Sequence, residues 1–138
     1  MIRSWHLGDD RQSLVLASFD DRLPEAVYWG PALPTGENLE TLSAAALADV
    51  TGGMVDRNAG LSLCPEASES FPGQTGLTAR NVSGAPLMPS FRFESEAASV
   101  HGLTLVFADK SLDLSLVFDL VLTPETSLLK LQTRLESA

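Results

Sequence analysis

The sequence contains few of the residues on which disulfides, metal sites and nucleophilic catalysis depend. Its 138 residues include one cysteine, Cys64, and two histidines, His6 and His101. A single cysteine cannot form an intramolecular disulfide, and a zinc site needs three or four ligands. Cys64 has no basic neighbour that would lower the pKa of its thiol, which favours a small buried hydrophobe over a nucleophile. The sequence therefore predicts no metal site and no cofactor.

Local catalytic patterns are also missing. No G-x-S-x-G stretch is present, and Gly73 to Gly76 is not followed by the Lys-Ser or Lys-Thr of a phosphate-binding loop. Acidic residues are abundant, but the Asp-Asp pairs at 9–10 and 20–21 are typical of solvated turns, and the other acids are scattered. We therefore expect no catalytic carboxylate pair of the glycosidase type within this chain.

Basic residues are scarce. Nine Lys and Arg stand against eighteen Asp and Glu, which gives a net charge of −9. Nucleic acid and anionic membrane surfaces need a cationic partner, so this balance argues against both. No apolar run approaches the roughly 20 residues of a membrane span. Residues 1–10 lack the basic and apolar regions of a secretion signal, and together with the single cysteine this favours a cytoplasmic location.

The first third of the chain has the pattern of short strands. Residues 2–7, 13–19 and 25–29 are rich in apolar and aromatic side chains, and the polar turns at 8–10 and 20–21 separate them. Residues 13–19 are apolar on both faces, which indicates burial on both sides. Connections this short exclude parallel crossovers, so an antiparallel meander is expected.

One helix is expected after this meander. Asn38 can cap a helix over residues 39–50, where Leu39, Leu42 and Val50 recur on one face of an alanine-rich stretch. The helix is expected to stop at Gly52-Gly53.

Residues 61–93 form the most unusual stretch of the sequence. They contain seven prolines and glycines that disfavour helices and strands, at positions 65, 72, 73, 76, 84, 86 and 89. We therefore expect a long loop here. Long loops in compact domains are often functional, so this segment is the first place to look for a binding role.

The last third is strongly β in character. In residues 103–107, two leucines and a phenylalanine alternate with Thr104 and Val106. Residues 112–122 keep a period of two, and residues 129–135 repeat the alternation with three leucines. The sequence thus predicts a mainly β fold, an antiparallel β-sandwich with one short helix and a long loop, as one domain over residues 1–138. The strong final strand would leave an unpaired sheet edge, so we expect a piece of a longer chain whose last hairpin self-associates.

Aromatic residues are the best candidates for ligand contact. Trp5, Trp29 and Phe71 offer flat surfaces on which a sugar ring can stack, and Arg80 can donate to hydroxyls or carboxylates. Tyr28 and Trp29 are adjacent on a strand and point to opposite faces, so at least one should be in the core. Structural alternatives are that Phe71 packs the loop onto the sheet and that Arg80 pairs with a nearby acid.

Taken in order, the motifs resemble the N-terminal region of family 36 glycoside hydrolases, the α-galactosidase group. The resemblance covers nearly the whole chain. It lies in Trp5-His6-Leu7, Ser13-Leu14-Val15-Leu16, Val27-Tyr28-Trp29-Gly30, Leu33-Pro34, the helix over residues 39–47, Leu61-Ser62-Leu63, Pro65-Glu66, Gly76-Leu77 and the region from Arg80 to Phe91.

This resemblance implies a non-catalytic β-sandwich, part of a β-supersandwich, that packs on a (β/α)8 barrel of roughly 250 residues absent from this sequence. In such enzymes two aspartates on the barrel carry out retaining hydrolysis, and neither corresponds to a residue here. The family also implies a homo-oligomer in which a loop, here residues 66–80, reaches a neighbouring active site. Phe71 and Arg80, with Trp29 and Trp5, would then shape the substrate entrance or touch a galactoside at a subunit boundary.

Two other interpretations remain open. A self-standing carbohydrate-binding module would use Trp5, Trp29 or Phe71 as its stacking platform. A β-rich interaction protein would have no connection with sugars. Binding of glycans by the isolated chain separates the first from the second, and the coding sequence downstream separates both from the hydrolase domain.

Overall fold

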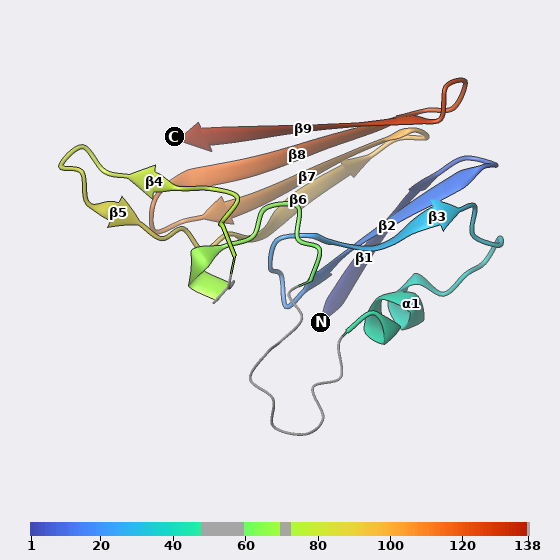
Figure 1. Cartoon of the computed structure of the whole chain (residues 1–138), viewed down its shortest axis with the longest axis horizontal. Helices are drawn as coiled ribbons and strands as arrows, with labels where there is room; N and C mark the ends of the chain where they lie inside the picture. Colours follow the sequence, from blue (N-terminus) through green and yellow to red (C-terminus); the bar gives the residue numbers. More distant parts are fainter. Residues whose placement is uncertain (48–59, 70–72, 138) are drawn as a thin grey trace.

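The structure is a computed structural model that describes residues 1–47, 60–69 and 73–137. It is mainly β, with a three-stranded sheet, a four-stranded sheet and a small two-stranded ribbon, all antiparallel. In Figure 1 the helix α1 (Leu39–Ala45) lies beside the three-stranded sheet, on the side away from the four-stranded sheet. The predicted fold class, a mainly β sandwich-like fold with one short helix, is confirmed.

The N-terminal sheet is the expected meander of β1 (Ile2–Gly8), β2 (Gln12–Phe19) and β3 (Glu25–Pro31). Leu14 of β2 lies opposite Leu7 on one side and Trp29 on the other. Apart from its first residue, β2 is buried on both faces, as its continuous apolar run predicted.

The helix α1 (Leu39–Ala45) covers the outer face of this sheet, where Ser43 Oγ lies 2.9 Å from Ser4 Oγ of β1. Its predicted N-cap is confirmed, since Asn38 Oδ1 accepts a hydrogen bond of 2.9 Å from the Thr41 N–H. The helix ends at Ala45, earlier than expected. Its last turn tightens: the Ala46 N–H is shared between the Leu42 and Ser43 carbonyls, and the Leu47 N–H bonds to the Ala44 carbonyl, three residues back. The predicted residues 48–50 and the Gly52-Gly53 stop lie outside the described residues.

The C-terminal sheet is a second meander of β6 (Arg92–Ala98), β7 (Gly102–Asp109), β8 (Leu114–Thr123) and β9 (Leu128–Ser137). The strand β6 was not predicted. The predicted strand over 112–122 begins two residues late, because Asp113 has a φ of 57° in the β7–β8 turn and cannot extend the strand.

The core lies between the two large sheets. Most of the residues that the period of two singled out are buried: Leu103, Leu105, Phe107, Leu116, Phe118, Leu120 and Leu122. Leu112 in the β7–β8 turn and Leu114 at the start of β8 are only half-buried. A series of aromatic contacts crosses this core, from Trp5 to Phe93, from Phe93 to Phe107 and from Phe107 to Phe118, with ring centroids 5.8 to 6.1 Å apart.

The inward face of β9 is the exception. Leu131 and Leu135 lie opposite buried Leu120 and Leu116 of β8, yet they remain 43% and 46% exposed. The three-stranded sheet covers β7 and β8 but leaves the fourth strand uncovered. The expected leucine-lined face of the last two hairpins therefore enters the core through β7 and β8, and β9 contributes to it only through the partly buried Leu129.

Candidate functional site

The 61–93 segment is fixed to the body of the domain at its start. Ser62 forms an isolated antiparallel bridge with Glu25 at the beginning of β3. The Ala26 N–H donates to the Leu61 carbonyl, and the Leu63 N–H donates to the Pro24 carbonyl, each at 2.9 Å. The segment thus begins as an extension of the N-terminal sheet rather than as a free loop.

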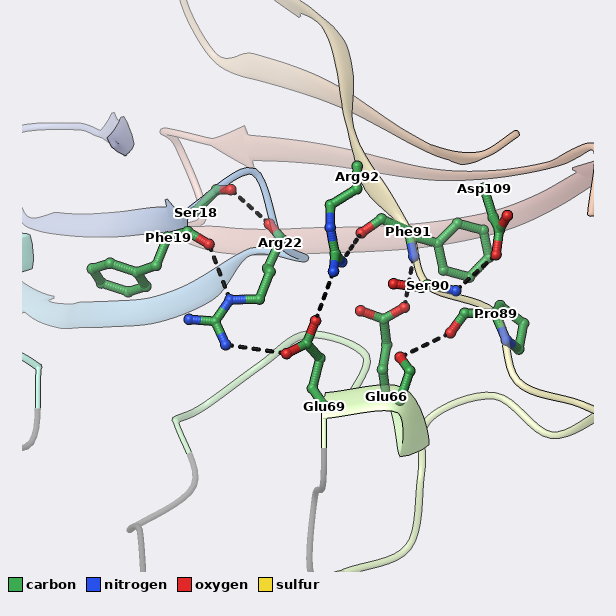
Figure 2. Close-up of polar contacts among 11 residues, drawn as sticks. Ser18, Phe19, Arg22, Glu66, Glu69, Pro89, Ser90, Phe91, Arg92 and Asp109 are labelled. Atoms are coloured by element: carbon green, nitrogen blue, oxygen red, sulfur yellow. Dashed lines mark hydrogen bonds and ion pairs between the residues drawn. The ribbon is translucent and has the colours of Figure 1, made fainter. Parts of the chain in front are cut away.

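A group of charged residues, the loop-base cluster of Arg22, Glu66, Glu69, Arg92 and Asp109, fixes the next part. Figure 2 shows the cluster between the β2–β3 turn, the 3-10 helix η1 (Ala67–Glu69) and the start of β6. Glu69 accepts from Arg22 Nη1 at 3.2 Å and from Arg92 Nη2 at 3.0 Å. One carboxylate therefore links the turn, the segment and the C-terminal sheet.

Glu66 is the half-buried acid of this cluster. Its Oε1 accepts a 2.8 Å hydrogen bond from the Phe91 N–H, which comes just before β6 (Figure 2). Burial raises the pKa of the Glu66 carboxyl, and the Phe91 N–H and the charge of Arg92 offset only part of that effect. The neighbouring Cys64 is buried, and burial followed by the Glu66 charge raises the pKa of its thiol, as expected for an unreactive core cysteine.

Asp109 ends β7 and is only 6% exposed. Its Oδ2 accepts from the Ser90 N–H at 2.8 Å, and its Oδ1 accepts from the N–H and hydroxyl of Ser111 and from the Leu112 N–H. Burial acts to raise the pKa of Asp109, but these hydrogen bonds outweigh it, and the pKa lies below its ordinary value. Asp109 is thus an ionised acceptor that joins the β7–β8 turn to the end of the 61–93 segment.

The cluster has the chemistry of an anchor. Its carboxylates accept from backbone N–H groups, from arginines and, at Asp109, from the Ser111 hydroxyl. Among the contacts of the described residues, no hydroxyl or thiol hydrogen-bonds to Glu66 or Glu69. Within the described ranges, no group of three Cys, His, Asp or Glu is placed to hold a metal ion. The chemical consequence is a fixed base for the segment that follows.

Beyond the base, the segment forms a ribbon of β4 (Ala79–Arg80) and β5 (Pro86–Leu87) rather than the continuous loop expected. Its turn is closed by Asn81 Oδ1, which accepts from the N–H groups of Ser83 and Ala85. Gly84 occupies the left-handed region with a φ of 84°. In Figure 1 the ribbon projects from one end of the molecule.

Arg80 lies on this ribbon with its side chain exposed. Its Nη1 donates to the Gly84 carbonyl at 2.9 Å, and it forms no ion pair with an acid of residues 1–47, 60–69 or 73–137. Phe71, the other predicted residue of the loop, lies outside the described residues.

The two tryptophans differ sharply in position. Trp5 is 8% exposed, packs against Phe93 and donates through Nε1 to Glu96, so it is a core residue and its ring is not open for stacking on a sugar. Trp29 is 66% exposed on β3 and its Nε1 donates to Gln12 Oε1 at 3.2 Å. Its neighbour Tyr28 is only half-buried. The prediction that at least one residue of this pair lies in the core is therefore wrong.

The structure does not bring these predicted site residues together. Trp29 lies near the end of β3, whereas Arg80 belongs to the ribbon at the opposite end of the long axis in Figure 1. No known protein family model matches this chain, and no curated protein matches it.

A second polar contact lies in a shallow hollow of about 320 Å³ between β1 and the segment before α1. There His6 Nε2 lies 2.8 Å from Ser13 Oγ, which also accepts from the Leu33 N–H at 3.0 Å. Ser13 is buried at 1% exposure, so its hydroxyl fastens the segment to the sheet and is not open to a substrate. No helix in the described part of the chain is long and apolar enough to cross a bilayer.

Sequence reasoning missed the loop-base cluster. Its only local sign is the spacing of Glu66 and Glu69 beside Pro65, which fits one turn of helix carrying two acids. The two arginines that complete it lie 47 and 23 positions from Glu69, too far for a local pattern to reveal.

Proposed function

We propose that this chain is a non-catalytic N-terminal β-sandwich domain of an α-galactosidase-like glycoside hydrolase. Its role is to pack on a (β/α)8 barrel of the same protein, to aid assembly of a homo-oligomer and to shape the substrate entrance. The chain has no enzymatic activity by itself, while the parent protein is a retaining cytoplasmic glycosidase. The motif order from Trp5 to Phe91 and the mainly β fold support this proposal.

The observation that carries the proposal is the construction of the 61–93 segment. Its base is fixed by Glu66, Glu69 and Asp109 to three different elements, and its ribbon projects with Arg80 exposed (Figures 1 and 2). A rigid base with a projecting end suits a segment that must reach a neighbouring surface reproducibly. In this proposal that surface is the mouth of a barrel, with a galactoside at a subunit boundary.

The first test is the coding sequence after residue 138. The proposal expects a (β/α)8 barrel of roughly 250 residues in the same reading frame. A stop codon close to residue 138 refutes it. In the full-length protein, Arg80→Ala is expected to raise the KM for an α-galactoside with little change in kcat, because a contact at the substrate entrance binds the ground state and the transition state equally. Lys110→Ala, an exposed cation in the β7–β8 turn, is the matched control.

The exposed indole of Trp29 favours a second candidate, a self-standing carbohydrate-binding module. Titration of the 138-residue chain with galactosides and other glycans, followed by tryptophan fluorescence, distinguishes the two. The hydrolase-domain proposal expects no saturable change. A saturable change that disappears in Trp29→Ala supports the binding module. If the gene encodes no barrel and the chain binds no glycan, the third interpretation, a β-rich interaction protein, is favoured.

A further inference from the structure

We propose that β9 pairs with β9 of a second copy of this chain, antiparallel and centred on Thr133, so that two four-stranded sheets become one continuous sheet. Pairing through β9 requires neither a barrel nor a sugar. It depends only on the edge strand and on the side chains that the strand presents.

The edge of β9 is available. The strand runs over ten residues and pairs with β8 on one side, and no strand of the described residues pairs with its other side. In an edge strand, alternate N–H and C=O groups point outward without a ladder partner. The inward side chains Leu131 and Leu135 are also 43% and 46% exposed. Both the backbone edge and the apolar face of β9 therefore lack a partner among the described residues.

The sequence of β9 complements itself in one antiparallel register. With Thr133 opposite Thr133 of the second copy, Lys130 lies opposite Glu136 and Leu131 lies opposite Leu135. Each of these pairs occurs twice, because the arrangement is two-fold symmetric. Directly opposite residues share a face of the sheet, so the leucines of both copies meet on the inner face and the opposite charges meet on the outer face.

Neighbouring registers lack this match. A shift of two positions is the smallest that keeps the leucines on the inner face. In one direction it places Lys130 opposite Arg134, and in the other it places Arg134 opposite Arg134 of the second copy. Like charges directly opposite destabilise a strand pair. The charge pattern therefore selects the register centred on Thr133.

Of the two cations on β9, only one forms an ion pair among the described residues. Arg134 is already held by Asp119 of β8 and by Glu136, whose Oε1 lies 3.3 Å from Arg134 Nε. Lys130 makes no ion pair with any residue in the described ranges. Pairing of two copies gives Lys130 a carboxylate directly opposite, while Arg134 keeps Asp119.

Charge reversal tests the register directly. The wild-type chain is expected to show a concentration-dependent monomer–dimer equilibrium in sedimentation velocity, with a Kd of about 1–100 µM for an interface this small. Lys130→Glu places two acids opposite each other, and Glu136→Lys places two cations opposite each other. Each variant alone is expected to weaken the dimer about tenfold or more.

Mixing the two variants is the decisive measurement. In the register centred on Thr133, the acids of Lys130→Glu face the cations of Glu136→Lys at both positions, so the mixture should form a heterodimer with near wild-type affinity. Lys110→Glu and Glu125→Lys, which make the same charge changes in turns outside β9, should dimerise as the wild type does. Circular dichroism verifies that each variant is folded.

Three results would overturn the proposal: a wild-type chain that stays monomeric up to about 1 mM, far above the expected Kd; a dimer that is indifferent to both charge reversals; or a mixture of the two variants that remains monomeric. The proposed function fails if the gene encodes no barrel, whereas β9 pairing is judged by the dimerisation of the chain alone. Failure of the proposed function and failure of β9 pairing can therefore be told apart.

Discussion

Asp109 provides the sharpest test of how the 61–93 segment is held to the sandwich. Replacing it with asparagine keeps the size of the side chain and one carbonyl oxygen but turns the other oxygen into an NH2 donor. Oδ1 can retain the bonds from Ser111 and Leu112, and the new NH2 then faces the Ser90 N–H, which lay 2.8 Å from Oδ2. One buried donor loses its acceptor, so we expect a loss of about 1–3 kcal/mol in the free energy of unfolding.

The same substitution predicts a dependence on pH. The pKa of Asp109 lies below its ordinary value of 3.8, so its ionised form stabilises the folded state above that value. This contribution is lost as pH falls through the folded-state pKa, and Asp109→Asn cannot show it. The difference between wild type and variant should therefore be constant from about pH 5 to pH 8 and shrink below about pH 4.

Urea unfolding followed by the fluorescence of buried Trp5 measures both effects. Asp113→Asn is the matched control, because Asp113 is exposed and asparagine tolerates its φ of 57°. The control should stay within about 0.5 kcal/mol of wild type. A value for Asp109→Asn inside the same limit, or an equal loss at pH 3 and pH 7, would refute the role assigned to Asp109.

Two other residues of the loop-base cluster give further predictions. Glu66→Gln keeps an acceptor for the Phe91 N–H but removes the negative charge. Because burial raises the pKa of the Glu66 carboxyl, its ionised form destabilises the fold, so the free energy of unfolding of the variant at pH 7 should be unchanged or slightly higher. This advantage should vanish as acidification protonates the wild-type carboxyl, and urea unfolding at pH 7 and pH 4 checks it. Glu69→Ala breaks two partly exposed ion pairs and should cost about 0.5–1.5 kcal/mol, with faster amide exchange in residues 61–69. Unchanged exchange there would contradict the anchoring role, and Glu125→Ala is the control.

Strands with a strict period of two could be predicted because one physical cause, burial of one face, determines the pattern. This is true of β7 and of β8 from Leu116 to Leu122, where the alternating apolar residues are buried and Val117 is the one buried residue out of phase. The strand β6 gave no such signal, because Glu94, Ser95 and Glu96 are polar and most of its side chains are exposed. Only its pairing with β7 makes it a strand, and pairing between distant residues cannot be seen in a local pattern.

Alternation alone also cannot say whether a face is covered. Leu131 and Leu135 have the same pattern as Leu116 and Leu120, but exposure depends on how far the opposing sheet extends. Trp5 and Trp29 show the same limit, since similar strand contexts place one in the core and the other in solvent. The loop-base cluster could not be predicted from the sequence either, because its residues come from separate elements that lie far apart in the chain.

The topology has a consequence for how the chain folds. Every strand of the described residues pairs with its neighbour in sequence, so each hairpin can close early at little entropic cost. Contacts that join the two sheets are of another kind: Trp5 bonds to Glu96, 91 positions away, and Gln12 Nε2 donates to the Ser127 carbonyl, 115 positions away. The slow step should therefore be the docking of two preformed meanders, on a timescale of about milliseconds to seconds. Until that step is complete, the leucines and phenylalanines of both inner faces are exposed together to solvent.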